Sequence, residues 1–274
     1  MSDTPKVRIE LTPHCYVPDR QVKINVRRTK AKDYKKATWG VFRYPPCAVV
    51  GGGLSVSAYL ETLKNWQGDI FAINDTAGYL SDNGIKCYLF AIDCTPTQFK
   101  IGENVKGALM ATRCHRNQFK QFPYEKIIVF DMAEEDNIGG IEGGPTAVCR
   151  TPHLLLRMGY ASVHYFGIDG SFVGQSHINQ NQKYAYDKMM VIKANGKTYL
   201  TNGALQLQNQ YMVNVFKKYG QFLMNQSEGL IKDLLADKDN WEVVAVSKDL
   251  KDEFDAAGNT MWNKPYTFTA TVPA

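Results

Sequence analysis

The chain has 274 residues, of which 44% are apolar and 22% are charged, and its formal net charge is +5. This composition is typical of a globular protein with one large domain or two smaller ones. No apolar run approaches the roughly 18 residues of a membrane span, which excludes a membrane-spanning chain. The first ten residues hold no apolar signal segment, so we expect a cytoplasmic protein without a membrane partner.

The cysteines show neither a C-x-x-C pair nor the Cys/His spacing of a zinc site. Cys47 and Cys87 fall in apolar runs that are typical of buried strands. We therefore expect reduced thiols in the core rather than a disulfide framework. The six cysteines are Cys15, Cys47, Cys87, Cys94, Cys114 and Cys149.

Residues 1–45 are a basic N-terminal extension without long helical periodicity. The alternating segments 7–11 and 22–26 are typical of short edge strands, and Pro45 and Pro46 end the extension. Its cations could attract an anionic partner such as nucleic acid, or they could form a solvated leader. They include Arg27, Arg28, Lys30, Lys32, Lys35 and Lys36.

From residue 46 onward, short apolar runs alternate with helical patterns. Helices are predicted at residues 55–66, 76–83 and 145–158, and Gly84 and Gly159 act as stop signals for the last two. Strands are predicted at residues 47–51, 69–73, 86–92, 108–111, 126–130 and 162–167.

The second half of the chain begins with a hairpin. Segments 189–193 and 197–201 flank Asn195-Gly196, which is a strong signal for a two-residue turn. A helix at 204–218, a short strand at 221–224 and a helix at 230–235 follow. The remaining tail includes β-prone segments at 242–246 and 266–272.

This order predicts an α/β, Rossmann-like fold with a mostly parallel sheet and helices on both faces. A small β-hairpin insertion and the irregular N-terminal extension are added to it. We expect residues 46–236 to form a nucleotide-binding core and residues 237–274 to form a C-terminal tail packed on that core.

In open α/β sheets, ligands bind beyond the carboxyl ends of the strands. Polar residues and glycines follow five of the predicted strands, so we expect them to converge on one edge. In chain order they are Gly51, Gly52, Gly53 and Ser55, then Asn74 and Asp75, then Asp93 and Thr95, then Asp131, and finally Asp169 and Ser171.

The glycine loop (Gly51, Gly52 and Gly53) joins a predicted strand to a predicted helix. Glycines let the backbone approach a phosphate closely, and a helix N-terminus offers N–H groups, although a tight turn also explains such a loop. The loop lacks the spacing of a P-loop or of a G-x-G-x-x-G motif. Gly144 and Thr146 could form a second anion site, or a turn that opens the helix at 145–158.

Four further residues have a functional and a structural interpretation. Asn74 and Asp75 could bind a ribose or a base edge, or they could cap the next helix. Asp93 and Asp169 could hold Mg²⁺ against a diphosphate, or they could cap solvated loops.

A polar loop follows the strand at 162–167 and supplies the remaining candidates. His177 could act as the general base, although a single loop histidine is more often non-catalytic. The Tyr184 hydroxyl could hold a leaving phosphate, or its ring could simply pack.

Three segments carry short motifs in a specific order: VVGGGLSVSAYLETLKNWQGDIFAINDTAGYLSDNGIKCYLFAIDCTP, GGPTAVCRTPHLLLRMGYASVHYFGIDGSF and YGQFLMNQSEGLIKDL. Together they cover roughly residues 47–235 and resemble the MptE-like 6-hydroxymethylpterin diphosphokinase family. Their layout is also similar to that of bacterial CMP-sialic acid sialyltransferases and Maf flagellin glycosyltransferases.

The resemblance implies which residues surround a nucleotide. Tyr184 would lie against its phosphate. The sialyltransferases have a tyrosine where this chain has Ser171 and Phe172, and their general-base histidine follows the tyrosines, whereas His177 precedes Tyr184. The other implied nucleotide-binding residues are Gly51, Gly52, Gly53, Ser55, Asn74, Gly144, Thr146 and Ser227.

We therefore expect a transferase that uses a nucleotide-activated donor, either a nucleotide sugar or ATP. Glycosyl transfer to an acceptor hydroxyl of a small molecule or glycan fits best, with His177 or Asp169 as the base. One alternative is an Mg²⁺-dependent diphosphokinase acting on a hydroxymethylpterin-like compound, with Asp93 and Asp169 on the metal. Another alternative is a catalytically silent binding or assembly protein on the same fold.

Overall fold

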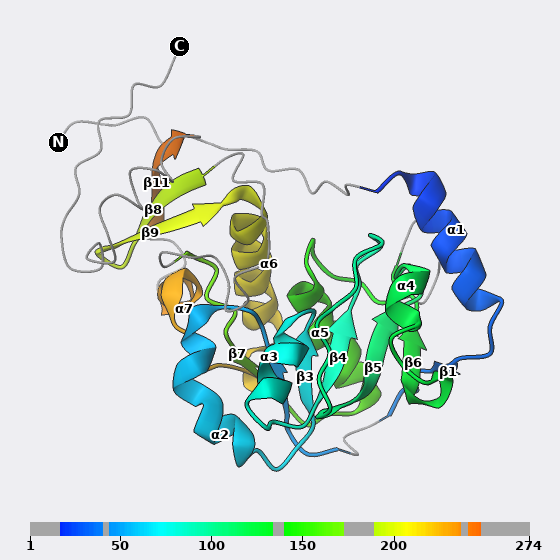
Figure 1. Ribbon diagram of the computed structural model, residues 1–274. Helices are drawn as coiled ribbons and strands as arrows, with labels where there is room; N and C mark the ends of the chain where they lie inside the picture. Colours follow the sequence, from blue (N-terminus) through cyan, green and yellow to red (C-terminus); the bar gives the residue numbers. More distant parts are fainter. Residues whose placement is uncertain (1–16, 41–43, 134–139, 173–188, 237–240, 248–274) are drawn as a thin grey trace.

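The computed structural model describes residues 17–40, 44–133, 140–172, 189–236 and 241–247. Their backbone forms an eight-stranded sheet in which all neighbouring strands are parallel (Figure 1). The predicted Rossmann-like sheet is therefore confirmed. In spatial order its strands are β1 (Lys35–Lys36), β6 (Ile127–Phe130), β5 (Val105–Ala111), β4 (Cys87–Ala91), β3 (Ile70–Ile73), β2 (Cys47–Val50), β7 (Val163–Phe166) and β10 (Leu223–Asn225).

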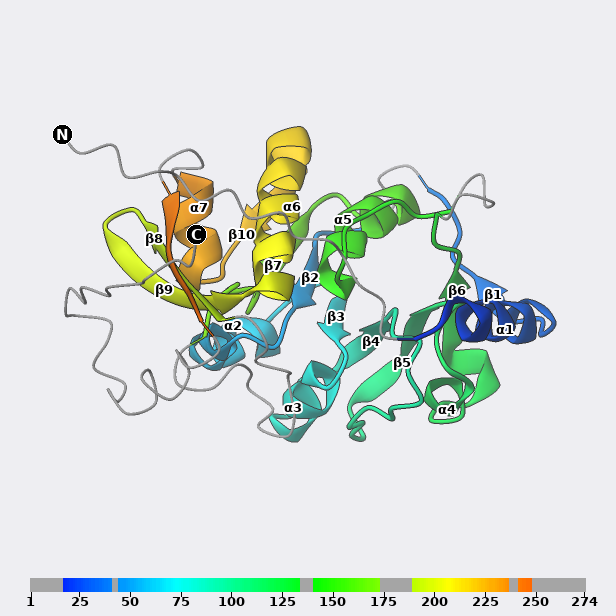
Figure 2. The same ribbon diagram turned by 90° about the horizontal axis from the view of Figure 1, so that it is seen from above.

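Helices cover both faces of the large sheet. Helices α5 and α6 lie on one face, and α2, α3 and α4 lie on the other (Figure 2). The helical elements of the core are η1 (Leu54–Tyr59), α2 (Leu60–Lys64), α3 (Thr76–Asp82), α4 (Arg116–Phe119), η2 (Tyr124–Lys126), α5 (Ala147–Met158), α6 (Gly203–Tyr219), η3 (Gly220–Phe222) and α7 (Gly229–Ala236).

The central strands form the core because helices shield them on both sides. All four residues of β2 are fully buried, and so are Val163 and Tyr165 of β7. Continuous apolar runs of this kind are typical of parallel strands covered on both faces. Burying one large aliphatic side chain stabilises the fold by about 1.5–3 kcal/mol, so the buried positions of these strands are mainly apolar.

The strand order reverses beside β2. Strands β3, β4, β5 and β6 add successively on one side of β2, and the chain then returns through α5 to place β7 on the other side. The segments that follow β2 and β7 therefore lead away from each other, which leaves a crevice between the carboxyl ends of these two strands. Such a crevice is the switch point at which open α/β sheets bind ligands.

A three-stranded antiparallel sheet of β8 (Met189–Ala194), β9 (Lys197–Asn202) and β11 (Trp241–Ser247) flanks the core (Figure 1). The β8–β9 turn has φ values of 50° at Asn195 and 71° at Gly196, as the Asn-Gly signal predicts. Ile192 and Tyr199 pack against α7 in a separate small core. The hairpin expected from the sequence is thus confirmed, and it acquires a third strand from the tail.

The edge strand expected at 22–26 is wrong, because the structure has a helix there, α1 (Asp19–Lys30). Its buried residues, Val22, Asn25 and Thr29, follow a spacing of three and four. Two of the three are polar, so a pattern of apolar residues could not reveal the helix. The β-prone segments 7–11 and 266–272 lie outside the described residues.

Smaller expectations have different outcomes. The helix expected at 55–66 begins as the 3₁₀ helix η1 and becomes α-helical at Leu60. The five described cysteines are free and buried, as expected, whereas Cys15 lies outside the described residues. Within the described ranges, no helix combines the length and the apolar character that a membrane crossing requires.

Candidate functional site

A cavity of about 140 Å³ lies at the switch point, beyond the carboxyl ends of β2, β3 and β7. Its wall combines backbone from the strand ends with the first turns of two helices. The lining residues are Gly51, Gly52, Gly53, Ile73, Asn74, Thr146, Ala147, Val148, Gly167, Ile168, Asp169, Gly170, Ser171, Phe172, Asn202, Ala204, Leu205 and Gln208.

The N-termini of α5 and α6 meet at this cavity. Ala147 and Val148 begin α5, Ala204 and Leu205 lie in the first turn of α6, and all four line the wall. Neither first turn contains an acidic residue. First-turn N–H groups have no acceptor inside their own helix, and the helix dipole makes this end positive. Two long helices therefore direct positive potential into the same small space.

Side-chain amides add further donors to the wall. The Thr146 hydroxyl donates to Gln208 Oε1 at 2.8 Å and does not cap α5. Asn202 Oδ1 accepts from the Leu205 amide at 2.9 Å and caps α6. Because the oxygens of Gln208 and Asn202 are engaged, their NH₂ groups remain as donors without an acceptor among the described residues.

Asn74 contributes an acceptor from the end of β3. Its backbone is left-handed, with a φ of 51°, which is uncommon for a residue other than glycine. Its side-chain Oδ1 is buried and has no donor in the part of the chain that the structure describes. A strained backbone and an unsatisfied buried oxygen are both costly, and such features concentrate at ligand sites.

The structure gives Gly51 and Gly53 a role in packing. A Cβ on Gly51 would overlap the carbonyl oxygen of Gly167, at the end of β7. A Cβ on Gly53 would lie 2.5 Å from Asp169 Cγ. These two glycines therefore let the β2 and β7 loops approach each other, whatever ligand binds nearby.

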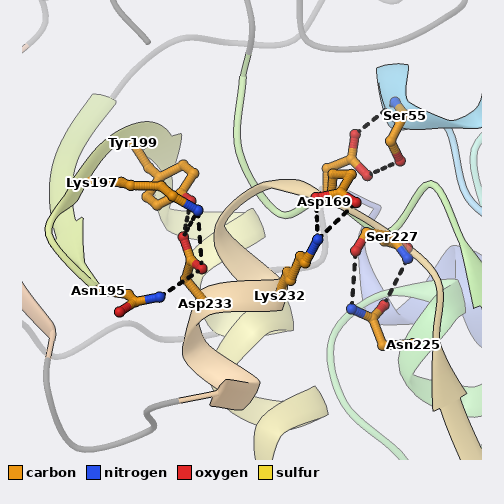
Figure 3. A network of polar contacts seen from close by, with 10 residues as sticks. Ser55, Asp169, Asn195, Lys197, Tyr199, Asn225, Ser227, Lys232 and Asp233 are labelled. Carbon is orange, nitrogen blue, oxygen red and sulfur yellow. Dashed lines mark hydrogen bonds and ion pairs between the residues drawn. The ribbon is translucent and has the colours of Figure 1, made fainter. Parts of the chain in front are cut away.

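Asp169 caps the start of η1 (Figure 3). The Ser55 amide donates to Asp169 Oδ2 at 3.0 Å, and the Ser55 hydroxyl donates to Oδ1 at 2.5 Å. Burial raises the pKa of the Asp169 carboxyl, although both bonds from Ser55 oppose that shift. A carboxyl group thus occupies the helix start that follows the glycine loop, where a phosphate would otherwise bind.

Ser227 forms hydrogen bonds to the backbone at the end of β7. Its hydroxyl accepts from the Ile168 amide at 2.9 Å and donates to the Tyr165 carbonyl at 3.4 Å. Its backbone amide and carbonyl both bond to the Asn225 side chain (Figure 3). Ser227 does not line the cavity. Ser171 does line it, and its hydroxyl accepts from the Leu230 amide at the start of α7.

Three other predicted site residues lie away from the cavity lining. Asp75 Oδ1 accepts from the Lys100 amide at 2.8 Å and so ties down a neighbouring loop. Gly144 leaves room for the ring of Tyr211. Asp93 accepts from the Thr95 amide at 2.9 Å in a local turn.

Asp93 and Asp169 do not form a shared metal site. They follow β4 and β7, which are separated by β3 and β2, so about 14 Å of sheet lies between their strands. In the described ranges, no group of three or more His, Cys, Asp or Glu side chains could hold a metal ion. The described residues therefore do not fit an Mg²⁺ ion held between these two aspartates.

The predicted base His177 and the predicted phosphate ligand Tyr184 lie outside the described residues. The histidines that the structure does describe have other partners. His115 caps α4, His153 contacts the Tyr211 hydroxyl at 3.0 Å, and His164 contacts the Ser162 hydroxyl at 3.2 Å.

Three lining residues, Asn202, Ala204 and Gln208, were not among the residues expected from the sequence. One signal was available: Asn202 directly precedes the predicted helix at 204–218, which is a typical position for an N-cap. No sequence pattern indicated that this helix start would meet the helix start after Thr146. Comparisons of the chain with protein-family models, curated proteins and solved structures found no match.

Proposed function

We propose that the protein is a transferase that binds the phosphate of a nucleotide-activated donor in the switch-point cavity. The carrying observation is that α5 and α6 direct their first turns into one cavity, and that the first turn of α5 has no side-chain cap. Backbone N–H groups and a positive dipole end favour a phosphate at such a position. The NH₂ groups of Gln208 and Asn202 supply two more donors for the same anion.

The cavity size limits which part of the donor it can hold. A cavity of about 150 Å³ holds a group the size of benzene. The 140 Å³ cavity is thus suited to a phosphate or a single ring, and the rest of a nucleotide would extend along the sheet edge. Asn74 Oδ1 needs a donor, which a ribose hydroxyl or a base amino group would provide.

Glycosyl transfer is the reaction that we favour. The acceptor oxygen would form a bond to the donor carbon, the bond from that carbon to the phosphate oxygen would break, and a base would take the hydroxyl proton. Donors fixed at the cavity would stabilise the charge that develops on the leaving phosphate. His177 and Asp169 remain the candidate bases. Because Ser55 engages both Asp169 oxygens, we assign Asp169 a positioning role for η1 as well.

A catalytically silent nucleotide-binding protein is the second candidate. The full engagement of the Asp169 carboxyl by Ser55 favours it. The Mg²⁺-dependent diphosphokinase alternative is not supported, because Asp93 lies away from the cavity lining and no acidic cluster accompanies Asp169 in the described ranges.

A thermal-shift screen with CMP-, UDP- and GDP-sugars, ATP and the free nucleotides tests the proposal. A ligand at 100 times its Kd stabilises the fold by about 2.7 kcal/mol, which raises Tm by about 5 °C in a protein of this size. Asn74→Gly should keep the stability, because glycine tolerates the left-handed backbone, while weakening binding of the best ligand.

Turnover separates the two candidates. A transferase should slowly hydrolyse its donor or pass its group to an added acceptor, whereas a silent protein should bind the nucleotide and leave the donor intact. EDTA should change neither result. Calorimetry that detects no nucleotide at millimolar concentration would rule out the nucleotide site altogether.

A further inference from the structure

Helix α1 holds most of the protein's excess positive charge. It carries five cationic residues against one acidic residue, Asp19, in a chain with a net charge of +5. Four of these cations follow a spacing of three, four and three, which places them on one side of a helix. They are exposed, and they are called the cationic face below: Arg20, Lys23, Arg27 and Lys30.

The opposite side of α1 fixes the cationic face in place. Val22, Asn25 and Thr29 are buried against the core. The Asn25 amide donates to the carbonyls of Cys94 and Arg113, both at 3.2 Å. These bonds anchor α1 to the loops after β4 and β5, so its cations belong to a packed surface rather than to a solvated leader.

One cation from α4, Arg116, adds to this charged surface. Arg28 of α1 and Arg116 of α4 both interact electrostatically with His115. Burial lowers the pKa of His115 most, and the two arginines lower it further, whereas Asp93 acts in the opposite direction. Lys30 forms an ion pair with Asp131 at 3.4 Å. The positive charges at this junction therefore outnumber the acidic groups that face them.

We propose that the cationic face binds the phosphate backbone of a nucleic acid. Its four residues span ten positions, or about 15 Å of helix. A strand of duplex places one phosphate every 3.4 Å along the axis, so about four phosphates pass along this length. Arginine, which supplies half of the face, presents a planar fork that matches phosphate oxygens.

The arrangement of α1 favours nucleic acid over two other partners. A helix that binds a membrane surface must place its apolar side in the lipid, but the buried side of α1 packs against its own protein. The centre of a protein–protein interface is usually depleted of charged residues, whereas every residue of the cationic face is charged.

The cationic face is separate from the switch-point cavity. Its anchors follow β4 and β5, while the cavity lies beyond β2, β3 and β7, and no α1 residue lines that cavity. The proposal therefore does not depend on the proposed transferase activity, and either one can fail alone.

Fluorescence anisotropy with the full chain tests the proposal. The probes are a labelled 20-nucleotide single-stranded RNA and a labelled 20-base-pair DNA duplex, measured between 50 and 200 mM KCl. Four phosphate contacts predict a log–log salt slope of about −2.8 for the single strand, or about 50-fold weaker binding across this range.

The test variant is the triple substitution Arg20→Gln, Lys23→Gln and Arg27→Gln. It should weaken binding at least tenfold at 100 mM salt and reduce the slope by about 2. Glutamine keeps a high helix propensity, and circular dichroism should report an intact fold. The single variant Arg27→Gln, with a slope reduced by about 0.7, repeats the test with a smaller perturbation.

A matched control removes three exposed cations elsewhere: Lys64→Gln, Lys106→Gln and Lys217→Gln. It changes the net charge equally and should leave binding nearly unchanged. Equal losses in both triple variants would overturn the proposal, because overall charge would then explain binding. Absence of binding at 50 mM salt, or binding restricted to phosphatidylserine vesicles, would overturn it as well.

Discussion

A carboxylate introduced at residue 204 should weaken phosphate binding without lowering the stability of the fold. Ala204 is exposed, lines the cavity and is the second residue of α6. Aspartate is favourable in a helix's first turn, where it interacts with the dipole by about 0.3–1 kcal/mol. Ala204→Asp should therefore leave the free energy of unfolding unchanged or slightly raised. The same carboxylate would repel any phosphate that the α5 and α6 N-termini hold.

The expected loss of affinity follows from Coulomb's law. For this calculation we take the carboxylate and a phosphate in the cavity to lie about 8 Å apart. At an effective dielectric constant near 20, two like unit charges at that distance repel by about 2 kcal/mol. That energy weakens binding by about 30-fold, and a doubly charged phosphate would weaken it further.

Calorimetry with the best nucleotide from the screen measures this loss, and thermal melts measure stability. Ala204→Asn is the matched control, because it has nearly the same shape without the charge and should bind within a fewfold of the wild type. Raising the salt concentration should partly restore binding to Ala204→Asp. A change in Kd below threefold for Ala204→Asp would refute the placement of the anion between α5 and α6.

Three further substitutions test the packing and titration of buried groups, and a fourth, at the exposed Gly220, is a control. Gly51→Ala should cost about 3 kcal/mol in an unfolding experiment because its Cβ meets the Gly167 carbonyl, whereas Gly220→Ala, with open space around it, should stabilise the fold by about 0.5 kcal/mol. Burial raises the pKa of Asp169, so its contribution to the stability of the fold is present in acid and is lost as pH rises through its folded pKa. The Tm of Asp169→Asn relative to wild type should therefore increase between pH 4 and 7. Burial alone would raise the pKa of Asp233, but its hydrogen bonds lower it, so Asp233→Asn should destabilise by about 3 kcal/mol at pH 7 and by less below about pH 4.

The expectation for Asp233 follows from its buried hydrogen-bond network. Tyr199, Lys197 and Asn195 from the β8–β9 hairpin all donate to its carboxylate, which lies on α7 (Figure 3). A constant difference in Tm between wild type and Asp233→Asn from pH 3 to pH 7 would show that these bonds do not lower its pKa. Likewise, a pH-independent difference for Asp169→Asn would contradict the raised pKa of Asp169.

Local sequence patterns were sufficient to predict a mostly parallel sheet and most of the helices that cover it. Buried parallel strands need apolar runs, and a two-residue hairpin needs residues such as Asn195 and Gly196 that accept a positive φ. Helix α1 was not predicted because two polar residues, Asn25 and Thr29, lie on its buried side. Polar residues are buried there because tertiary hydrogen bonds satisfy them, and a short window of sequence cannot show those bonds.

The glycine loop shows most clearly what the tertiary structure decided. The sequence determined that glycines stand between a buried strand and a helix, which is compatible with a phosphate site or with close packing. Contacts between residues 114 positions apart then brought Asp169 onto Ser55 and gave Gly53 its structural role. The meeting of the α5 and α6 N-termini arises in the same way, because the strand order determines which helix starts become neighbours.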